Sequence, residues 1–466
     1  MDYRIEKDSV GEKEIPVDAY YGVHSLRAME NFPITGLKLH KEMIIAISQI
    51  KKACAMTNYN VGLLDKVKCD AIIEACDELI LGNYHEQFIV DPIQGGAGTS
   101  TNMNANEVIA NIALEKLGHK KGSYHIINPN DDVNMGQSTN DVYPSCGKLA
   151  TLKLIIKSIH ALEELNYSLE IKANEFKDII KMGRTQLEDA VPISLGQEFH
   201  SYSSAIKRDI KRFKKSLEEI EVLNLGGTAI GTGLNAHIDY VKEVVPTLKE
   251  IIGIDVVQAE DLIDGTQNLD CYVLISGIIK SCAVNLSKMC NDLRIMNSGP
   301  RTGIGEINLP PRQNGSSIMP GKINPVIPEV VNQIAFNIIG NDTTITLAAE
   351  GGQLELNAFE PIIFYNLFES LDTLTNGINT LNENCIKGIK ANKEECIHLL
   401  EHSVGMITAV TPYIGYEKAA QIAKEALANN VSIRSLILKD KLIPEEKLDK
   451  ILDPSKMISP GIIEKR

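Results

Sequence analysis

The sequence has no tryptophan, and aromatic residues make up only 5% of its 466 residues. It also lacks a C-x-x-C pair, and its nine cysteines are an odd number, so neither a zinc ribbon nor a disulfide framework is indicated. No apolar run of about 18 residues, the length that spans a bilayer, occurs. The polar N-terminus lacks the apolar region of a signal peptide. We therefore expect a cytoplasmic protein with reduced thiols and no membrane span.

Basic residues are also fewer than acidic residues. Lys and Arg number 47 against 61 Asp and Glu, which gives a formal net charge of −14. This balance argues against binding to nucleic acid or to an anionic membrane. A small anion is still acceptable as a ligand if its site is locally positive. Hydrophobic residues at 44% and charged residues at 23% are typical of a globular chain with ample core.

Helical periodicity dominates the middle of the chain. Between Tyr272 and Met296 the apolar residues follow an unbroken 3-4-3-4 spacing, which predicts a long helix in a bundle. A second stripe runs from Leu152 to Leu169, and 201–221 is also expected to be helical. Because such helices bury only a narrow seam, they need several partners, and self-assembly would supply them. After about residue 390 the predicted helices become short.

Three short motifs have weak alternative interpretations. Gly315 to Lys322 superficially suggests a phosphate loop, but five residues separate its glycines and Ile323 stands where Ser or Thr would bind magnesium. His398 to His402 matches H-x-x-E-H, without an evident third zinc ligand, and is interpreted as an ordinary helix turn. Gly231-Thr232-Gly233 is a broken dinucleotide fingerprint. The basic run at 207–215 is interpreted as a solvated helix face.

The segment from Gly315 to Pro325 carries the most concentrated polar chemistry. Lys322 and Asn324 suit a carboxylate, because one supplies a point charge and the other a directed donor. Gly315 and Gly321 permit a backbone that moves and closes. Other glycine-rich loops carry neutral hydrogen-bonding groups, at Thr99, Ser138, Thr139, Asn140, Thr185 and Gln186.

On these residues the chain resembles the aspartase/fumarase superfamily, whose members eliminate ammonia, water or amines to leave fumarate. Gly315 to Asn324 is similar to the signature loop of that family, and the resemblance covers essentially the whole chain. It implies a mainly α fold with three domains, in which a long central helical bundle forms a tetramer core. The expected domains are an N-terminal mixed, mainly helical domain at 1–140, the bundle at 141–392 and a small C-terminal helical domain at 393–466.

Within the superfamily the segments resemble aspartases more than class II fumarases. Ala19 to His24, Gln137 to Asp141, Pro325 to Glu329 and Gly352 to Asn357 all read as aspartase. Gln186 points the same way, since fumarases and some aspartases carry His there. Gln cannot act as a general acid, and ammonia leaving from a protonated amine does not need one, whereas water leaving from malate does.

The resemblance implies a role for each site residue. Ser316 is the base that removes the Cβ proton of L-aspartate, through an aci-carboxylate intermediate. Substrate binding is expected from the β-carboxylate pocket (Thr99, Ser138 and Thr139), the amine site (Asn140, Thr185 and Gln186), a carboxylate contact (Ser317) and the α-carboxylate clamp (Lys322 and Asn324).

The resemblance also implies that these groups come from three subunits of a homotetramer. No cofactor is required, and no metal ligands are identified. Some aspartases respond to magnesium, but no ligand cluster in the sequence identifies such a site. Two alternatives stay open, namely class II fumarase and a non-catalytic structural member of the superfamily.

Overall fold

The structure, a computed structural model, describes residues 2–464 and is mainly helical, which confirms the predicted fold class. The chain forms two compact units. Unit 1 comprises Met1–Ile159, Lys211–Ser281 and Phe336–Leu374, and unit 2 comprises His160–Ile210, Cys282–Ala335 and Thr375–Arg466. The division into three domains at 140 and 392 stays a prediction.

Five long helices each contribute one end to each unit. They are α5 (Thr139–Glu175), α6 (Leu195–Ile220), α9 (Asp270–Met296), α10 (Val326–Glu350) and α11 (Glu360–Asn384). The predicted seam of α9 is confirmed, because every apolar position of the 3-4 repeat from Tyr272 to Met296 is buried, with at most 4% exposure. Each buried side chain of this kind stabilises the fold by about 1.5–3 kcal/mol. The repeat therefore fixes which face of α9 packs inward.

The same helix is the one described helix that is long and apolar enough to cross a membrane by length and composition alone. Its best window has a mean hydropathy of 1.3. The core helix of a soluble protein meets the same criterion, and the buried seam of α9 fits that explanation. The absence of a membrane span stays a prediction.

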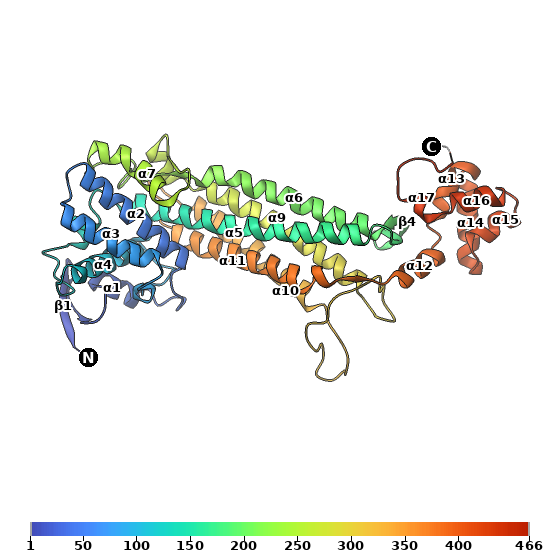
Figure 1. Ribbon diagram of the computed structural model, residues 1–466, viewed down its shortest axis with the longest axis horizontal. Coiled ribbons are helices and arrows are strands. Elements are labelled where there is room, and N and C mark those ends of the chain that lie inside the picture. The colour runs from blue at the N-terminus through green and yellow to red at the C-terminus, as the bar shows by residue number, and fades with distance from the viewer. Residues whose placement is uncertain (1, 465–466) are drawn as a thin grey trace. The chain divides into compact units, whose positions relative to one another are not determined.

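The N-terminal part of unit 1 is built on three packed helices, α2 (Lys41–Asn60), α3 (Lys66–Ile80) and α4 (Thr99–Lys116) (Figure 1). Ile47 of α2, Ile72 of α3 and Val108 of α4 are fully buried. Before them come an antiparallel hairpin and a short helix, β1 (Tyr3–Asp8), β2 (Gly11–Pro16) and α1 (Val23–Asn31). A 3₁₀ turn (His85–Gln87) and a π-helical turn (Pro129–Val133) lie in the connections.

The rest of unit 1 surrounds a parallel pair of two-residue strands. The elements are β5 (Val222–Leu223), α7 (Ile238–Ile252), β6 (Val257–Gln258) and α8 (Leu262–Gln267). Asp261 begins α8 by accepting hydrogen bonds from two backbone N–H groups, as a typical N-cap does. These elements hold the glycine-rich loop at 224–233, which follows β5.

Unit 2 contains two antiparallel strand pairs that the sequence did not predict. They are β3 (Ile180–Thr185) with β4 (Glu188–Ser194), and β7 (Ile307–Asn308) with β8 (Lys390–Ala391). A 3₁₀ turn (Ile386–Gly388) leads into β8. The predicted short C-terminal helices are confirmed as α12 (Lys393–His402), α13 (Ile407–Ile414), α14 (Tyr416–Asn429), α15 (Ile433–Lys439), α16 (Glu445–Ile451) and α17 (Pro454–Met457). Val410, Ile422, Leu448 and Ile451 lie at their core.

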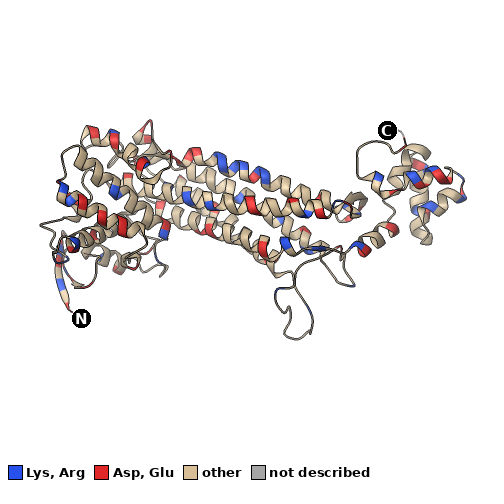
Figure 2. Ribbon diagram, in the orientation of Figure 1, with Lys and Arg blue, Asp and Glu red and all other residues tan. Residues whose placement is uncertain are grey.

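The basic run on α6 is solvated, as predicted. Figure 2 shows it as a series of blue segments along that helix. All six cations are exposed, namely Lys207, Arg208, Lys211, Arg212, Lys214 and Lys215. Lys207 pairs with Glu170 of α5. The run therefore does not need a polyanionic partner to explain it.

Candidate active site

Two helix N-termini meet in unit 1, and the predicted residues of this unit lie at them. Thr99 is the first residue of α4 and Thr139 is the first of α5. Asn102, one turn into α4, donates its Nδ2–H to Thr139 Oγ1 over 3.2 Å, which joins the two ends. Helix N-termini present unpaired N–H groups and partial positive charge. Such helix N-termini are suited to bind a carboxylate.

Gly98 is required for this approach. Its φ of +88° is left-handed, and a Cβ added there would lie 2.4 Å from the ring of Tyr143 on α5. Thr99 beside it is exposed, and its hydroxyl donates to the Gly96 carbonyl over 2.7 Å. The glycine-rich loop therefore brings α4 against α5 and leaves Thr99 facing outward.

A buried lysine supports the turn that precedes α5. Lys51 of α2 is fully buried and donates to Asn134 Oδ1 and Gln137 Oε1, each over 2.8 Å. Burial lowers the pKa of Lys51 to about 8, so it is still mainly charged at neutral pH. Asn102 also donates to Asn134 Oδ1, over 3.1 Å. Lys51 and Asn102 could not be recognised from the sequence, because a lysine or asparagine inside a helix looks like an ordinary surface residue.

Asp141 organises the turn from the other side. Its fully buried carboxylate accepts the Ser138 N–H over 2.9 Å, and the Gly226 and Thr228 N–H groups over 3.0 and 3.2 Å. Burial raises the pKa of Asp141 to about 6, although these three donors lower it. Ser138 Oγ accepts the Asn140 N–H over 3.3 Å, as in a helix cap. Ser138, Thr139 and Asn140 are therefore held in one defined turn.

In unit 2, Thr185 and Gln186 lie at the exposed tip of the β3–β4 hairpin. The two residues between the paired Thr185 and Glu188 both have positive φ, +56° for Gln186 and +66° for Leu187. This is the geometry of a tight hairpin turn that usually takes Asn or Gly. Non-glycine residues in this region are strained, and such strain gathers at functional sites.

A buried ion cluster fixes the base of this hairpin. Glu306 is fully buried and pairs with Lys181 of β3 over 2.9 Å and with Arg184 over 2.7 Å. Burial alone would lower the pKa of Lys181, but the charges of Glu198 and Glu306 hold it above its ordinary value. The cluster lies directly before Thr185, so it sets where the hairpin tip begins. Glu306 could not be recognised from the sequence, since nothing local marks it as buried.

The signature loop connects β7 to α10. The Gly315 N–H donates to the Lys322 carbonyl over 2.7 Å, and Asn324 Nδ2 donates to the Gly315 carbonyl over 2.8 Å, which closes the loop at its base. Ser316 Oγ accepts the N–H groups of Ile318 and Met319, over 3.2 and 2.9 Å. Backbone donors aimed at a hydroxyl oxygen stabilise its anionic form. Ser317 and Lys322 are exposed.

Lys322 and Asn324 line an open cavity of about 1000 Å³. The lining also includes one more cation, one carboxylate and four further amides, namely Arg294, Glu329, Asn291, Asn297, Asn308 and Asn392. Cations and amide donors of this kind bind carboxylates, and the role of Lys322 and Asn324 as the α-carboxylate clamp stays a prediction.

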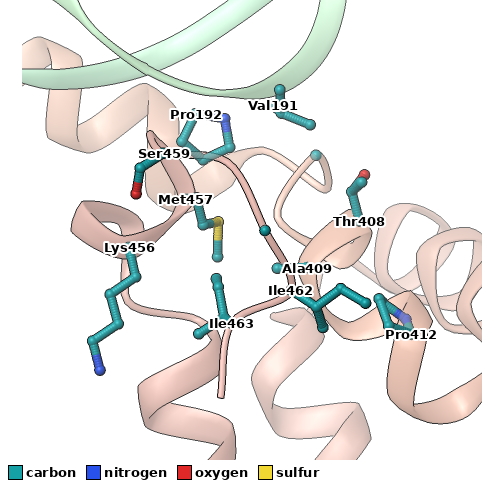
Figure 3. Close-up of a pocket in the computed structure, with 12 residues that line it drawn as sticks. Val191, Pro192, Thr408, Ala409, Pro412, Lys456, Met457, Ser459, Ile462 and Ile463 are labelled. Atoms are coloured by element: carbon teal, nitrogen blue, oxygen red, sulfur yellow. The ribbon is translucent and has the colours of Figure 1, made fainter. Parts of the chain in front are cut away.

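The structure thus divides the predicted residues into two groups. Unit 1 holds Thr99, Ser138, Thr139 and Asn140, and unit 2 holds Thr185, Gln186, Ser316, Ser317, Lys322 and Asn324. A separate cavity of about 200 Å³ at α13 and α17 contains none of them (Figure 3). Its lining is largely apolar, with Met457, Ile462 and Ile463 among the residues drawn there.

Residues 2–464 contain no group of three or more His, Cys, Asp or Glu side chains placed to hold a metal ion. The H-x-x-E-H motif lies on α12, where the rings of His398 and His402 are 4.3 Å apart. His402 Nδ1, which would be a ligand in a zinc site, forms a hydrogen bond with the His398 carbonyl. The motif is therefore a helix turn in this part of the chain.

Comparisons with known proteins cover nearly the whole chain. A family described as "Lyase" matches residues 11–340, and "Fumarase C C-terminus" matches residues 406–459. The aspartate ammonia-lyase of Bacillus subtilis is 54% identical over 99% of this chain and 97% of its own length, and that of Escherichia coli is 49% identical over 99% and 98%. The structure of a "fumarate lyase:delta crystallin" from Brucella melitensis, bound to cobalt, superposes with a TM-score of 0.95 at 48% identity, covering 98% of this chain and all of that one. The class II fumarase of Schistosoma mansoni also gives 0.95, at 33% identity over 99% of this chain and all of its own.

Proposed function

The chain belongs to the aspartase/fumarase superfamily of lyases, and we propose that it catalyses the reversible elimination of ammonia from L-aspartate to give fumarate. It is an enzyme of the carbon–nitrogen lyase class. The observation that carries this function is the 49–54% identity to aspartate ammonia-lyases over 99% of the chain. Class II fumarase is not favoured, since the fumarase compared above is only 33% identical. Gln186 at the hairpin tip also lacks an acidic proton for expelling water.

The two helix N-termini of unit 1 suit the substrate carboxylate that is adjacent to the reacting carbon. When the Cβ proton leaves, this β-carboxylate becomes an aci-carboxylate dianion. Thr99, Ser138 and Thr139 supply hydroxyl groups there, and the start of each helix supplies N–H groups and dipole charge. Such preorganised donors stabilise the developing charge more than the ground state, which is the source of catalysis.

Ser316 is the base in this proposal. Serine is a weak base unless its alkoxide is stabilised. The two N–H groups that Ser316 Oγ accepts already point at the oxygen that would carry the charge. Lys322 and Asn324 bind the α-carboxylate of the substrate. Ser317, which lies in the same loop, also contacts a substrate carboxylate. Closure of the loop, hinged on glycines, brings Ser316 to the Cβ proton.

The amine site consists of Asn140, Thr185 and Gln186. These neutral groups accept hydrogen bonds from the ammonium of L-aspartate without donating a proton to it. Ammonia leaves from an amine that is already protonated, so an acid catalyst is unnecessary.

The active unit in this proposal is a homotetramer with sites shared among three subunits. Its support is an exposed apolar face on α10, where Phe336 is 64%, Ile339 is 39% and Leu347 is 65% exposed in the single chain. Exposed apolar patches of this kind mark interaction surfaces. Association would also combine the residues of unit 1 from one chain with those of unit 2 from another.

The chemistry above uses side chains and backbone groups of the chain, so no required cofactor is proposed. Activation by magnesium stays part of the proposal without a site, since the described residues contain no group of three or more His, Cys, Asp or Glu placed to hold a metal ion. A cytoplasmic location is supported by nine free cysteines, eight of which are buried, as expected in a reducing compartment. The partners are L-aspartate and fumarate, without nucleic acid or membrane.

The function is tested by following fumarate absorbance with L-aspartate and, separately, with L-malate. We expect turnover with L-aspartate only, and retention of that turnover after treatment with EDTA. Re-addition of magnesium then reports any activation. Turnover with L-malate alone would establish the fumarase alternative, and silence with both substrates in a folded protein would establish a non-catalytic member.

A further inference from the structure

The glycine-rich loop at 224–229 contacts a predicted substrate residue. Asn140 donates its Nδ2–H to the Ala229 carbonyl over 2.7 Å. A backbone carbonyl can only accept, so this contact determines which end of the Asn140 amide faces the loop. The amide oxygen, Oδ1, is therefore presented away from Ala229. An ammonium group has only donors, and an acceptor in that place is what it requires.

The loop is tied to the Asn140 turn by two further side chains. Asp141 accepts the N–H groups of Gly226 and Thr228 together with that of Ser138. Asn224 donates its Nδ2–H in the other direction, to the Asn140 carbonyl over 3.0 Å, and also to Thr266 Oγ1 over 3.0 Å. These contacts consequently hold the Ala229 carbonyl within hydrogen-bonding distance of the Asn140 side chain.

Thr228 is strained in this arrangement. Its φ of +56° is left-handed, which is unfavourable for a β-branched residue. Its side chain is 5% exposed, and its Oγ1 has no hydrogen-bond partner among the described residues. Strain of this kind persists where the surroundings enforce it, and it gathers at functional positions. Here the Asp141 carboxylate holds Thr228 in this conformation by accepting its N–H. The conformation of Thr228 in turn sets the orientation of the next residue, Ala229.

We propose that the 224–229 loop is a specificity element, which uses the Ala229 carbonyl to fix the Asn140 amide with Oδ1 toward the substrate's ammonium. The inference rests on the proposed function and extends it. The motif that superficially suggested a dinucleotide fingerprint begins two residues after Ala229. Gly231 of that motif packs against α8, since a Cβ there would lie 2.4 Å from the backbone N of Ile263. Asn224, Asp141 and Thr228 are positioning residues in this account, because they act through Asn140.

The reverse reaction provides the test, because ammonium and fumarate are then separate substrates. Asn224→Leu removes the donor to the Asn140 carbonyl at similar volume. We expect its KM for ammonium to rise by about tenfold or more, as loss of a hydrogen bond to a charged group does. Its KM for fumarate should change by less than about threefold, because the hydrogen-bond partners of the Asn224 side chain are Asn140, Thr266 and Ser145, and none of these is proposed to bind a carboxylate.

Asn104→Leu is the matched control. Asn104 is also fully buried, and its amide bonds the Gln87 carbonyl and the Ile89 N–H, but no hydrogen bond joins it to Asn140. A purely structural effect would appear in both variants, as a lower kcat per chain or as an equal change in both KM values. Thr228→Gly is the second variant, because it relieves the strained φ and should fold at least as well as the wild type. Its KM for ammonium should also rise selectively, and Thr228→Asn, which tolerates this φ and keeps a branched polar side chain, should stay closer to the wild type.

The outcomes separate the two levels of the proposal. A wild-type chain that does not aminate fumarate overturns the proposed function and this inference with it. A wild type that aminates fumarate, with ammonium KM unchanged in Thr228→Gly and in any folded Asn224→Leu, overturns the inference alone. Equal increases in both KM values in these variants would also overturn it. A selective rise in ammonium KM, absent from Asn104→Leu, supports it.

Discussion

Replacing Ser316 by alanine is expected to lower the rate of ammonia elimination by about 100- to 10,000-fold, the usual contribution of a positioned general base. The fold should be unaffected. Ser316 is only half-buried, and its hydroxyl accepts two N–H groups of its own loop without contacting another element. Removal of the hydroxyl leaves the N–H groups of Ile318 and Met319 without their acceptor, but these groups are exposed, so water can accept their hydrogen bonds at little cost. The loss should appear in kcat, since the hydroxyl acts on the proton in the transition state.

Ser432→Ala is the matched control for this prediction. Ser432 also accepts a backbone N–H, that of Ser435 over 3.2 Å, but at the start of α15 in the C-terminal helices. Its loss should cost at most about 1 kcal/mol of stability as a missing helix cap and leave turnover unchanged. Near-normal turnover by Ser316→Ala with a native circular dichroism spectrum would refute the assignment of Ser316 as the base.

Replacing Glu306 by alanine is expected to lower the free energy of unfolding by about 3–5 kcal/mol, the cost of removing one partner from a buried ion pair. The carboxylate is fully buried, with the Lys181 and Arg184 cations within 2.9 and 2.7 Å. Without it, Lys181 retains Glu198 at 2.8 Å, but Arg184 loses the only carboxylate that pairs with it in residues 2–464. The base of the hairpin that carries Thr185 and Gln186 should then no longer be fixed in position. These two residues would bind the substrate less well, so KM for L-aspartate should rise as well.

Urea denaturation at one fixed protein concentration measures this change, because the stability of an oligomer depends on concentration. Glu445→Ala is the control. Glu445 pairs with Arg434 on the surface, with 65% of its side chain exposed, and such pairs contribute about 0–1 kcal/mol. A Glu306→Ala variant as stable as Glu445→Ala would show that the cluster does not hold the hairpin.

The long helices could be predicted from the sequence because their information is local and repeated. Each step of the seam from Tyr272 to Met296 adds the same signal, and burial of that seam follows directly. The strands at 180–194 lack such repetition. Their turn is Gln186-Leu187, and the Asn-Gly or Asp-Gly that usually signals a tight hairpin is absent.

The functional segments could be named from the sequence, but their arrangement could not. Thr99 and Thr139 are 40 positions apart, and their helix ends are seen to meet only in the structure, through the contacts of Asn102 with Thr139 and of Gly98 with Tyr143. The supporting charges were missed for a related reason. Lys51 and Asp141 are polar residues within helical segments, and a buried charge is recognisable only once its partners are known.

The central claim is that this chain eliminates ammonia from L-aspartate at sites that combine unit 1 of one subunit with unit 2 of another. The most direct measurement mixes two variants, Thr139→Val in unit 1 and Ser316→Ala in unit 2, unfolds them together and refolds them as one pool. Fumarate release from L-aspartate is then followed. If sites are shared and the two variants assemble at random, about one quarter of the sites contain both the wild-type Thr139 and the wild-type Ser316. The mixture should then regain about a quarter of wild-type activity. A mixture that stays at the average of its two parents would contradict the account.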